Sequence, residues 1–385
     1  MAEMDEAYGK WAEGLSEKIL AKMECVVERN RNRIPCAAKD GAWNDCSKDN
    51  IGRWSNGFWA GINWQLYNVS KKPLFMESAR FTEKALDRCF LDYGFMDQNS
   101  GFRWLPSSYA SYALTKDKDS YNRLRLAADN LVGRFNSIGN FIRAWNEDGK
   151  KSRAGWASID GLMNLPLLYW ASRATGDMRY YAVDTKYTDT VLSHFIREDG
   201  SAIHIAEFDP KTGDFIAPKA GCGMDENSCW TKGHAWALYG LTLSYLHTKE
   251  DFYLDGAQHV ATSFLSRIPD NLLVPVDFCQ GEDCKWEDSS ASAIAACALI
   301  ELSGLDCQYA DAFFLAGVKM LESLVKNRLC LDKDRDELLE NCSASYHDKS
   351  QGIPLVYGDY FFIEALWKLM GKDVKIWGGG YGGKM

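Results

Sequence analysis

The sequence lacks the features that would place the protein in a membrane or on a nucleic acid. No apolar run reaches the roughly 18 residues that a membrane-spanning helix needs. Lysine and arginine form no long run, and the 385-residue chain carries a net charge of −9. Because DNA and anionic membrane surfaces are bound through basic footprints, we expect neither as a partner. A small anionic ligand, held by a few local donors, is not excluded.

Metal-binding signatures are missing as well. The 12 cysteines form no CxxC pair and no Cys/His box of zinc spacing, and the 6 histidines are widely spaced. We therefore expect no metal and no cofactor. Cys279 and Cys284 could form a disulfide, but we favour free thiols in a reducing cytosol. The N-terminal stretch MAEMDEAYGKWAEGL has no basic start or apolar core of a secretory signal, which favours a cytoplasmic protein.

Clear strand alternation is scarce, and one helical pattern recurs instead. A helical stretch ends in an aromatic residue or Leu and then Ser or Thr, a short polar turn follows, and an aromatic residue starts the next helix. The Ser/Thr positions are Ser70, Thr115, Thr175, Thr248 and Ser303, with a degraded sixth copy at 366–377. Such thin helical hairpins must stack or close into a ring to bury their apolar faces. Neither terminus resembles a polar capping repeat, so we predict a closed ring of about twelve helices.

The prediction is thus an all-α fold, an (α/α)6 barrel or six-hairpin toroid, forming a single domain over residues 1–385. Residues 195–215 contain a Gly-bearing turn and predict a short β-hairpin insertion. In such a ring the loops that lead into the inner helices converge on one end. We expect the functional residues in six such segments: 53–64, 96–108, 143–166, 229–240, 287–297 and 357–366.

Several motifs in these segments resemble the unsaturated glucuronyl hydrolases of glycoside hydrolase family 88. They are WSNGFWAG, MNLPLLYWAS with a following TGD, AWALYGLTLSY, DSSASAIAA and GDYFFIEAL, and they span about residues 50–366. The resemblance implies an (α/α)6 barrel. It also implies an enzyme that removes a 4,5-unsaturated uronic acid from the non-reducing end of lyase-generated oligosaccharides, such as glycosaminoglycan disaccharides. The rhamnogalacturonyl-type hydrolases share the fold and are the nearest rival.

The resemblance also implies a mechanism. A carboxylic acid protonates C4 of the vinyl ether, positive charge spreads over C5 and the ring oxygen, and water adds at C5. The resulting hemiketal opens and releases the aglycone sugar. This chemistry needs an acid and a shaped pocket, but no metal. The sequence does not indicate the aglycone, the linkage, the sulfation pattern or the oligomeric state.

Asp160 matches the family's acid/base residue. It is the single acid in the stretch WASIDGLMNLPLLYWAS, where Trp156, Leu162 and Met163 would partly desolvate it. Desolvation raises a carboxyl pKa and keeps the group protonated near neutral pH, as proton donation requires. Helix N-capping is the competing interpretation of an Asp at this position.

Asn99 stands where the family has its second carboxylate, and Gln98 replaces the usual His beside it. An amide can hold substrate or position water but cannot titrate. Three interpretations are open: a natural variant in which Asp160 works with Asn99 as a hydrogen-bonding partner, a replacement by Asp97 or Asp92, or an engineered Asp→Asn form. We favour natural divergence, because one designed substitution would not explain Gln98. Loss of the carboxylate also leaves open a catalytically weakened, sugar-binding toroid.

Further residues are assigned to substrate binding. Lys232 replaces a family Arg that would fork onto the substrate carboxylate, and it keeps the charge without the bidentate geometry. His234 could add a donor or be a neutral core histidine, while Asp288 and Ser289 suggest helix capping. His204 matches a family residue near the uronate ring, and Cys222 replaces a family Gln. The candidate stacking platforms, of which we expect two or three to face the pocket, are Trp54, Trp104, Trp145, Trp230 and Trp236.

Overall fold

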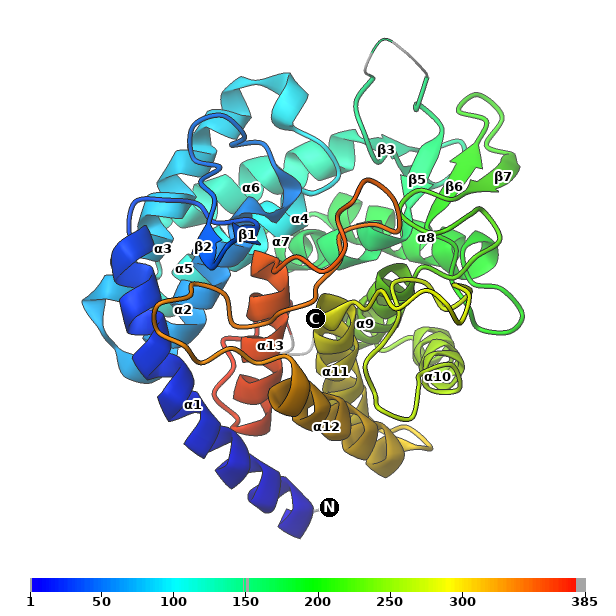
Figure 1. Ribbon diagram of the computed structural model, residues 1–385. Coiled ribbons are helices and arrows are strands. Elements are labelled where there is room, and N and C mark those ends of the chain that lie inside the picture. The colour runs from blue at the N-terminus through cyan, green and yellow to red at the C-terminus, as the bar shows by residue number, and fades with distance from the viewer. Residues whose placement is uncertain (1, 148, 150–151, 379–385) are drawn as a thin grey trace.

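Two concentric sets of helices form the molecule in the computed structural model, which describes residues 2–147, 149 and 152–378 (Figure 1). The inner set comprises α2 (Phe58–Ser70), the continuous stretch α4 (Ser100–Trp104), η4 (Leu105–Tyr109) and α5 (Ala110–Thr115), then α7 (Pro166–Thr175), α9 (Thr231–Thr248), α11 (Ser289–Ser303) and α13 (Val356–Leu369). The outer set comprises α3 (Pro73–Ala85), α6 (Lys118–Gly133), α8 (Met178–His194), α10 (Asp251–Leu265), α12 (Ala310–Asn327) and α1 (Ala2–Asn30).

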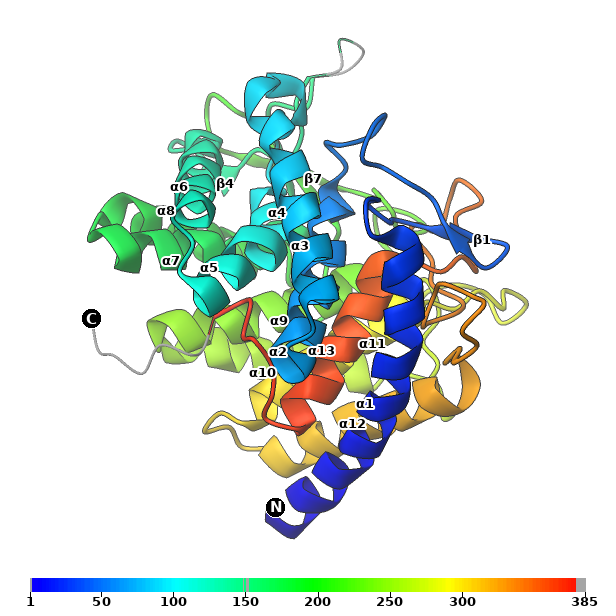
Figure 2. The same cartoon turned by 90° about the vertical axis from the view of Figure 1, so that its left-hand side faces the viewer.

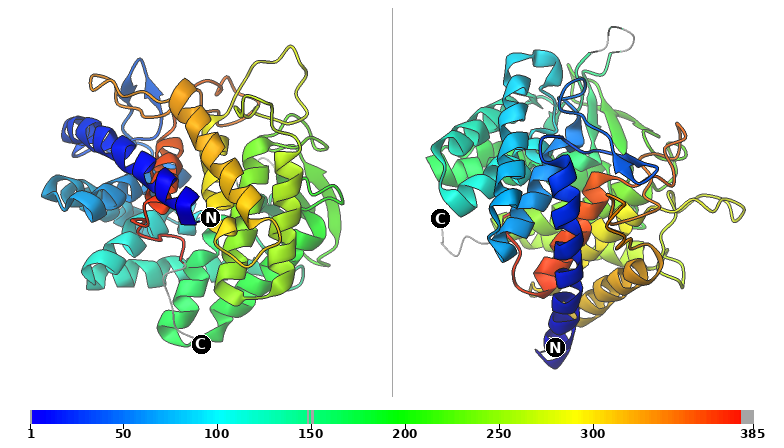
Figure 3. Two further views of the ribbon diagram at one scale, coloured as in Figure 1. Left: turned by 90° about the horizontal axis from the view of Figure 1, so that it is seen from below. Right: turned by 60° about the vertical axis from the view of Figure 1, so that its left-hand side comes forward.

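Each inner helix contacts the next one around the ring, and α13 contacts α2 to close it. The long helix α1 lies against α13 and α3, so the first and last helices meet (Figure 2). Seen from below, α1 and α12 lie outside α13 (Figure 3). The predicted (α/α)6 toroid is confirmed by this closure, and the single domain over residues 1–385 stays a prediction. None of the described helices is long and apolar enough to span a bilayer.

Burial separates the two sets of helices. Nearly every residue of α9 and α11 is buried, whereas α6 buries one face and leaves the other in solvent. Helix α11 contains the small-residue run SSASAIAACA, and small side chains allow neighbouring helices to approach closely. The amphipathic outer helices then shield the inner ring from water.

The recurrent Ser/Thr turns lie where the sequence predicts them, since α2, α5, α7, α9 and α11 end at the five named residues. Each terminal hydroxyl donates a hydrogen bond to a carbonyl of the preceding turn, as in Thr175 Oγ1 to Ala171 O at 2.8 Å. Gly176 then adopts the left-handed conformation (φ 73°) that ends α7, and Asp177 accepts from the backbone N–H of Arg179 to start α8. Local side-chain chemistry therefore sets the hairpin boundaries.

Short strands lie in the loops at one end of the ring, which is uppermost in Figure 1. The pairs β1 (Ala38–Lys39) with β2 (Ala42–Trp43) and β3 (Phe135–Asn136) with β4 (Phe141–Ile142) form two-stranded ribbons. The strands β5 (Trp156–Ser158), β6 (Ile205–Phe208) and β7 (Phe215–Lys219) form an antiparallel sheet in that order. The hairpin predicted at 195–215 is thus present but lies further along the chain, at 205–219, and gains β5 as a third strand.

Candidate active site

Asp160 lies in the turn η5 (Ile159–Asn164), which connects β5 to the inner helix α7. The residue that caps this turn is Ser158, and no side-chain capping bond is present, so the capping interpretation of Asp160 does not hold. The Asp160 side chain is 19% exposed and accepts a hydrogen bond from Gln98 Nε2 at 3.4 Å. The carboxyl group is therefore held between two inner-helix loops, with one edge open.

The sheet β5–β6–β7 places His204 beside Asp160. Ser158 pairs with Ile205, and the N–H of Ile159 donates to the carbonyl of His204 at 2.9 Å. His204 Nε2 consequently lies 4.0 Å from Asp160 Oδ1, although the two residues are far apart in the chain. The imidazole and the carboxyl group therefore border the same space.

One tautomer of His204 follows from its hydrogen bonding. Nδ1 accepts the backbone N–H of Cys222 at 2.8 Å, so in the neutral ring the proton is on Nε2, which faces Asp160. Burial lowers the pKa of His204 to about 4, which keeps the ring neutral at physiological pH. Gly221 makes the approach possible, since its φ is +58° and a Cβ there would lie 2.1 Å from Nδ1. His204 is thus an N–H donor and not a cation.

The pKa of Asp160 is raised to about 7, chiefly because burial penalises the carboxylate and secondarily because the charge on Asp97 repels it. Within the described chain no lysine or arginine lies within ion-pair distance of Asp160. A carboxyl group with this pKa is about half protonated at pH 7, so it can both give up and recover a proton there.

Gln98 reaches this carboxyl group from the loop before α4, and the next residue, Asn99, precedes the first turn of α4. The Asn99 side chain donates from Nδ2 to Asp97 Oδ2 at 3.1 Å, which orients the amide. Asn99 Oδ1, Gln98 Oε1 and Asp160 Oδ1 are buried acceptors without a hydrogen-bond partner. Buried acceptors without partners are costly, and several together indicate a place where a hydroxyl-bearing ligand or water donates.

Asp97 supplies the second negative charge of the cluster. It accepts from the N–H of Asn99 at 2.9 Å and forms a 3.0 Å ion pair with Arg103, which is itself 1% exposed. Asp92, the other acid considered from the sequence, instead accepts from the N–H of Gly94 in an exposed turn. Of these two acids, Asp97 is therefore the one placed to act on Asp160.

The prediction that Lys232 is a free cation for the substrate carboxylate is wrong. Its ammonium group donates to Ser343 O at 2.6 Å and Tyr357 Oη at 2.8 Å, and it lies 3.2 Å from Asp288 Oδ2. Lys232 is 1% exposed, and Asp288, which also caps α11 as expected, is fully buried. The pair is neutral overall and holds the loop ends of α9, α11 and α13 together.

Three further residues that the sequence assigned to substrate binding lie in the core instead. His234 is fully buried, with Nε2 on Val260 O and Nδ1 near Cys229 Sγ, so it is the neutral core histidine of the alternative interpretation. Trp104 is fully buried and stacks on Phe90, with ring centroids 4.5 Å apart. Trp236 is 2% exposed and packs between Phe102 and Phe361. The structure gives none of these rings an open face for a sugar.

The other three aromatic candidates lie in different surroundings. Trp230 packs against His204, with ring centroids 4.4 Å apart. Trp54 is partly buried and lies 4.9 Å from the Tyr357 ring, and Trp145 is partly buried and meets Trp156 edge-on. Trp54 and Trp145 are therefore partly accessible, as sugar stacking requires, whereas Trp230 is buried beside His204.

Cys222 contributes mainly through its backbone, which fixes the His204 ring. Burial raises the pKa of its thiol to about 11, so it is present as the neutral SH group. All 12 cysteines lie in the described part of the chain and are free thiols, Cys279 and Cys284 included.

Sequence reasoning missed Tyr187 of the outer helix α8. Its hydroxyl donates to Ser158 O at 2.7 Å and thereby holds the end of β5, directly before the turn that contains Asp160. Gly161 is required beside it, because a Cβ would lie 2.5 Å from the Tyr187 hydroxyl. The isolated glycine after Asp160 was the available signal, but its partner lies too far along the chain to be identified from a local pattern.

Comparison with known proteins identifies the family. The family model described as Glycosyl Hydrolase Family 88 matches residues 26–349. An unsaturated chondroitin disaccharide hydrolase of Streptococcus pyogenes serotype M1 is 34% identical over 320 residues, covering 81% of this chain and 80% of the relative. The unsaturated glucuronyl hydrolase of Bacillus sp. (strain GL1) is 31% identical over 323 residues, covering 82% and 86%.

Solved structures extend the likeness to nearly the whole chain. The crystal structure of unsaturated glucuronyl hydrolase from Bacillus sp. GL1 superposes with a TM-score of 0.88 at 28% identity, covering 96% of this chain and 98% of that one. A structure of an unsaturated glucuronyl hydrolase specific for heparin gives a TM-score of 0.85 at 25% identity, covering 95% and 98%. Together with the family match over most of its length, this shows that the chain belongs to glycosyl hydrolase family 88, the family of the unsaturated glucuronyl hydrolases.

Proposed function

We propose that this protein hydrolyses lyase-generated oligosaccharides by hydrating the C4=C5 double bond of their terminal unsaturated uronic acid, with Asp160 as the acid. The observation that carries the proposal is the partly buried carboxyl group of Asp160, which has no lysine or arginine partner among the described residues and whose pKa is raised to about 7. An ordinary surface aspartate would be ionised at neutral pH and could not deliver a proton.

In the proposed reaction, the Asp160 carboxyl transfers its proton to C4, and the vinyl ether becomes an oxocarbenium ion shared by C5 and the ring oxygen. A water molecule then adds at C5 and returns a proton to the Asp160 carboxylate. The C5 hemiketal opens, the former ring oxygen becomes the aldehyde oxygen at C1, and the aglycone leaves as an alcohol. Protons and electrons balance without a cofactor.

Asn99 is assigned to substrate positioning and not to proton transfer. Its carboxamide oxygen is buried without a partner, while its NH2 group is held by Asp97, so the oxygen is available to a sugar hydroxyl or to the attacking water. His204 offers its Nε2–H to the same space. The family's second carboxylate, which Asn99 replaces, would also add negative charge near the acid. We assign that electrostatic effect to Asp97, whose charge raises the pKa of Asp160.

The substrate class is proposed from the chemistry of the family. Relatives of this chain are unsaturated chondroitin disaccharide hydrolases and unsaturated glucuronyl hydrolases, and one solved variant holds dGlcA-Glc-Rha-Glc. We assign unsaturated glycosaminoglycan disaccharides as the substrate, with Trp54 and Trp145 as stacking surfaces.

The test is loss of the ultraviolet absorbance of the conjugated enoate in unsaturated chondroitin and heparin disaccharides. Wild-type protein should remove the absorbance, Asp160→Asn should not, and the matched control Asp92→Asn, which changes an acid that does not touch Asp160, should behave as wild type. Turnover in H₂¹⁸O should label C5, and turnover in D₂O should place deuterium at C4. Label at C1 with retention of the double bond would instead indicate direct glycosidic hydrolysis and refute the mechanism.

The sugar-binding alternative is separated by the same variants. Retained disaccharide binding by wild-type protein without any absorbance loss would support a toroid that has lost catalysis at Asn99. In that case Asn99→Asp should restore turnover, whereas under the hydrolase proposal the wild-type chain already turns over.

We also infer that the protein works in a reducing, cytosolic compartment. The 12 free cysteines, most of them buried, support this, because oxidising compartments favour disulfides. Cell fractionation followed by thiol counting of the recovered protein tests the inference.

A further inference from the structure

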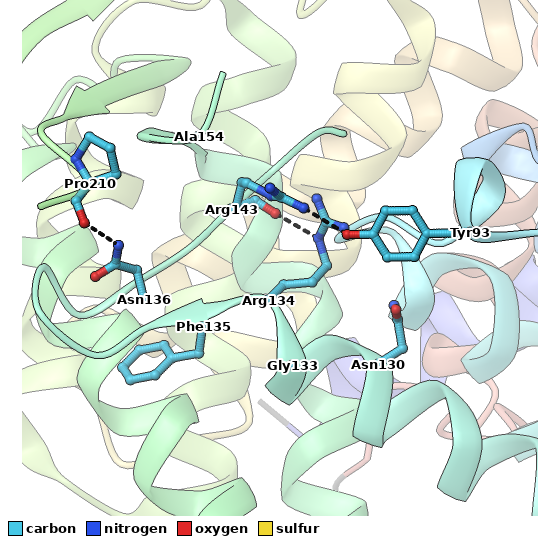
Figure 4. Close-up of a pocket in the computed structure, with 9 residues that line it drawn as sticks. All are labelled: Tyr93, Asn130, Gly133, Arg134, Phe135, Asn136, Arg143, Ala154 and Pro210. Atoms are coloured by element: carbon cyan, nitrogen blue, oxygen red, sulfur yellow. Dashed lines mark hydrogen bonds between the residues drawn. The ribbon is translucent and has the colours of Figure 1, made fainter. Parts of the chain in front are cut away.

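A pocket that lies outside the Asp160 site is lined by two arginines (Figure 4). Its volume is about 440 Å³, within the range typical of small-ligand sites. Its nine described lining residues include Arg134 and Arg143 and no acid, and Asp160 is not among them. The whole chain has a net charge of −9, yet this cavity carries two positive guanidinium groups.

The β3–β4 ribbon forces these two arginines together. Phe135 pairs with Ile142, so Arg134 and Arg143 are the next opposed positions, and their backbones are joined by a 3.1 Å hydrogen bond from Arg143 N to Arg134 O. Opposed residues project from the same face of a ribbon, and like charges there repel. The structure therefore carries a repulsive pair that a bound anion would relieve.

Arg134 is held rigidly at the end of α6. Its Nε donates to Arg143 O at 2.8 Å, and its Nη1 donates to Met96 O at 3.0 Å and Asn146 Oδ1 at 2.8 Å. The residue is 7% exposed, and its Nη2 is buried without any hydrogen-bond partner. Burial and the neighbouring Arg143 lower the pKa of Arg134 to about 10, which still leaves it charged.

The rest of the pocket suits a saccharide better than a bare ion. Arg143 donates to the hydroxyl of Tyr93, whose side chain is strongly exposed at 69% and offers a flat ring at the pocket edge (Figure 4). Asn130 gives its NH2 group to Asp97 O and Ser100 Oγ, which leaves its carbonyl oxygen for a hydroxyl donor. Guanidinium forks bind carboxylate or sulfate, and aromatic faces pack against the C–H surface of a sugar.

This pocket is also distinct from the catalytic site in position. The segment 96–98 separates them: its backbone carbonyls at Met96 and Asp97 receive Arg134 and Asn130, whereas the Gln98 side chain reaches Asp160 on the other side. From these contacts we propose that the Arg134–Arg143 pocket is a second, non-catalytic binding site for the carboxylate or sulfate group of an acidic saccharide unit. The choice of a saccharide agrees with the proposed function, but the anion-binding chemistry does not depend on it.

The experiment is calorimetric titration of the full chain with D-glucuronate, with D-glucose as the neutral probe and sulfate as a competitor. The site variant is Arg143→Ala, because Arg143 is partly exposed and its side chain donates a single described hydrogen bond, to Tyr93. The matched control is Arg80→Ala, which removes one exposed positive charge from the outer helix α3. Arg143→Lys keeps the charge but removes the fork.

We expect wild type and Arg80→Ala to bind glucuronate alike, Arg143→Ala to bind it about tenfold more weakly, and Arg143→Lys to fall between them. Glucose should not bind at this site, and sulfate should compete with glucuronate. Disaccharide turnover should be unchanged in Arg143→Ala, which separates this site from the Asp160 site. Equal affinity of wild type and Arg143→Ala, or an equal loss in Arg80→Ala, would overturn the proposal, even if the enzyme turns over disaccharide as proposed.

Discussion

Replacing Asp160 by Asn should stabilise the protein at pH 8 while it abolishes turnover. The wild-type carboxyl group must lose its proton in a partly buried site at this pH, and that ionisation is unfavourable there. Asparagine has nearly the same shape, can still accept from Gln98 Nε2, and carries no ionisation penalty. The variant should therefore be inactive but more stable than wild type at alkaline pH.

The magnitude follows from the pKa difference between the folded and unfolded states. A rise from 3.8 to about 7 corresponds to roughly 4 kcal/mol, at about 1.4 kcal/mol per pKa unit. Because the folded protein holds the proton more tightly than the unfolded chain, wild-type stability falls as pH rises from about 4 to 7. The penalty is absent below pH 4 and fully present above pH 7, so the advantage of Asp160→Asn should grow over that window.

The assay compares melting temperatures of wild type and Asp160→Asn at pH 4.5 and pH 8. With about 2 cal/mol/K of unfolding entropy per residue, 4 kcal/mol corresponds to about 5 °C in a chain of this length. The matched control Asp334→Asn removes an exposed loop carboxylate and should show no such pH-dependent gain. An Asp160→Asn advantage that is equal at both pH values, or a loss at pH 8, would refute the reasoning.

Three other substitutions probe the neighbouring contacts. Lys232→Met should lower the free energy of unfolding by about 3–5 kcal/mol, because it leaves the buried Asp288 carboxylate without its cation. Adding Asp288→Asn should recover part of this loss in denaturant titrations. Gly221→Ala should reduce kcat and leave the protein folded, since its Cβ would displace His204, and Gly149→Ala is the control at an open positive-φ glycine. Asp97→Asn should move the alkaline limb of the kcat profile to lower pH, because it removes the charge that raises the pKa of Asp160; an unchanged limb would exclude that coupling.

Local chemistry made the architecture predictable from the sequence. The Ser/Thr residues at 70, 115, 175, 248 and 303 end helices, and their hydroxyls donate to carbonyls of the preceding turn. These interactions act within a few residues, so a pattern in the sequence reports them directly. The position of Asp160 at the head of an inner helix was predictable for the same reason.

Pairings over long sequence distances were not predictable. Lys232 was assigned to the substrate because its partners, Asp288 and the carbonyl of Ser343, lie 111 residues or less away on other loops and leave no local trace. Trp104 is covered by Phe90, and Trp236 is covered by Phe102 and Phe361. These partners come from other parts of the chain, so the sequence near each tryptophan does not show whether its ring remains open. The sequence pattern identified the loops of the site but not the direction of every side chain.

The central claim is that Asp160 is protonated near neutral pH and acts as the proton donor. The most direct measurement is a ¹³C NMR titration of the aspartate carboxyl signals in the full chain, with Asp160→Asn used to assign the resonance. We predict that the Asp160 signal titrates with an apparent pKa of about 7 and that the kcat of wild type declines with the same midpoint. A titration midpoint near 4, typical of a solvated aspartate, would contradict the account.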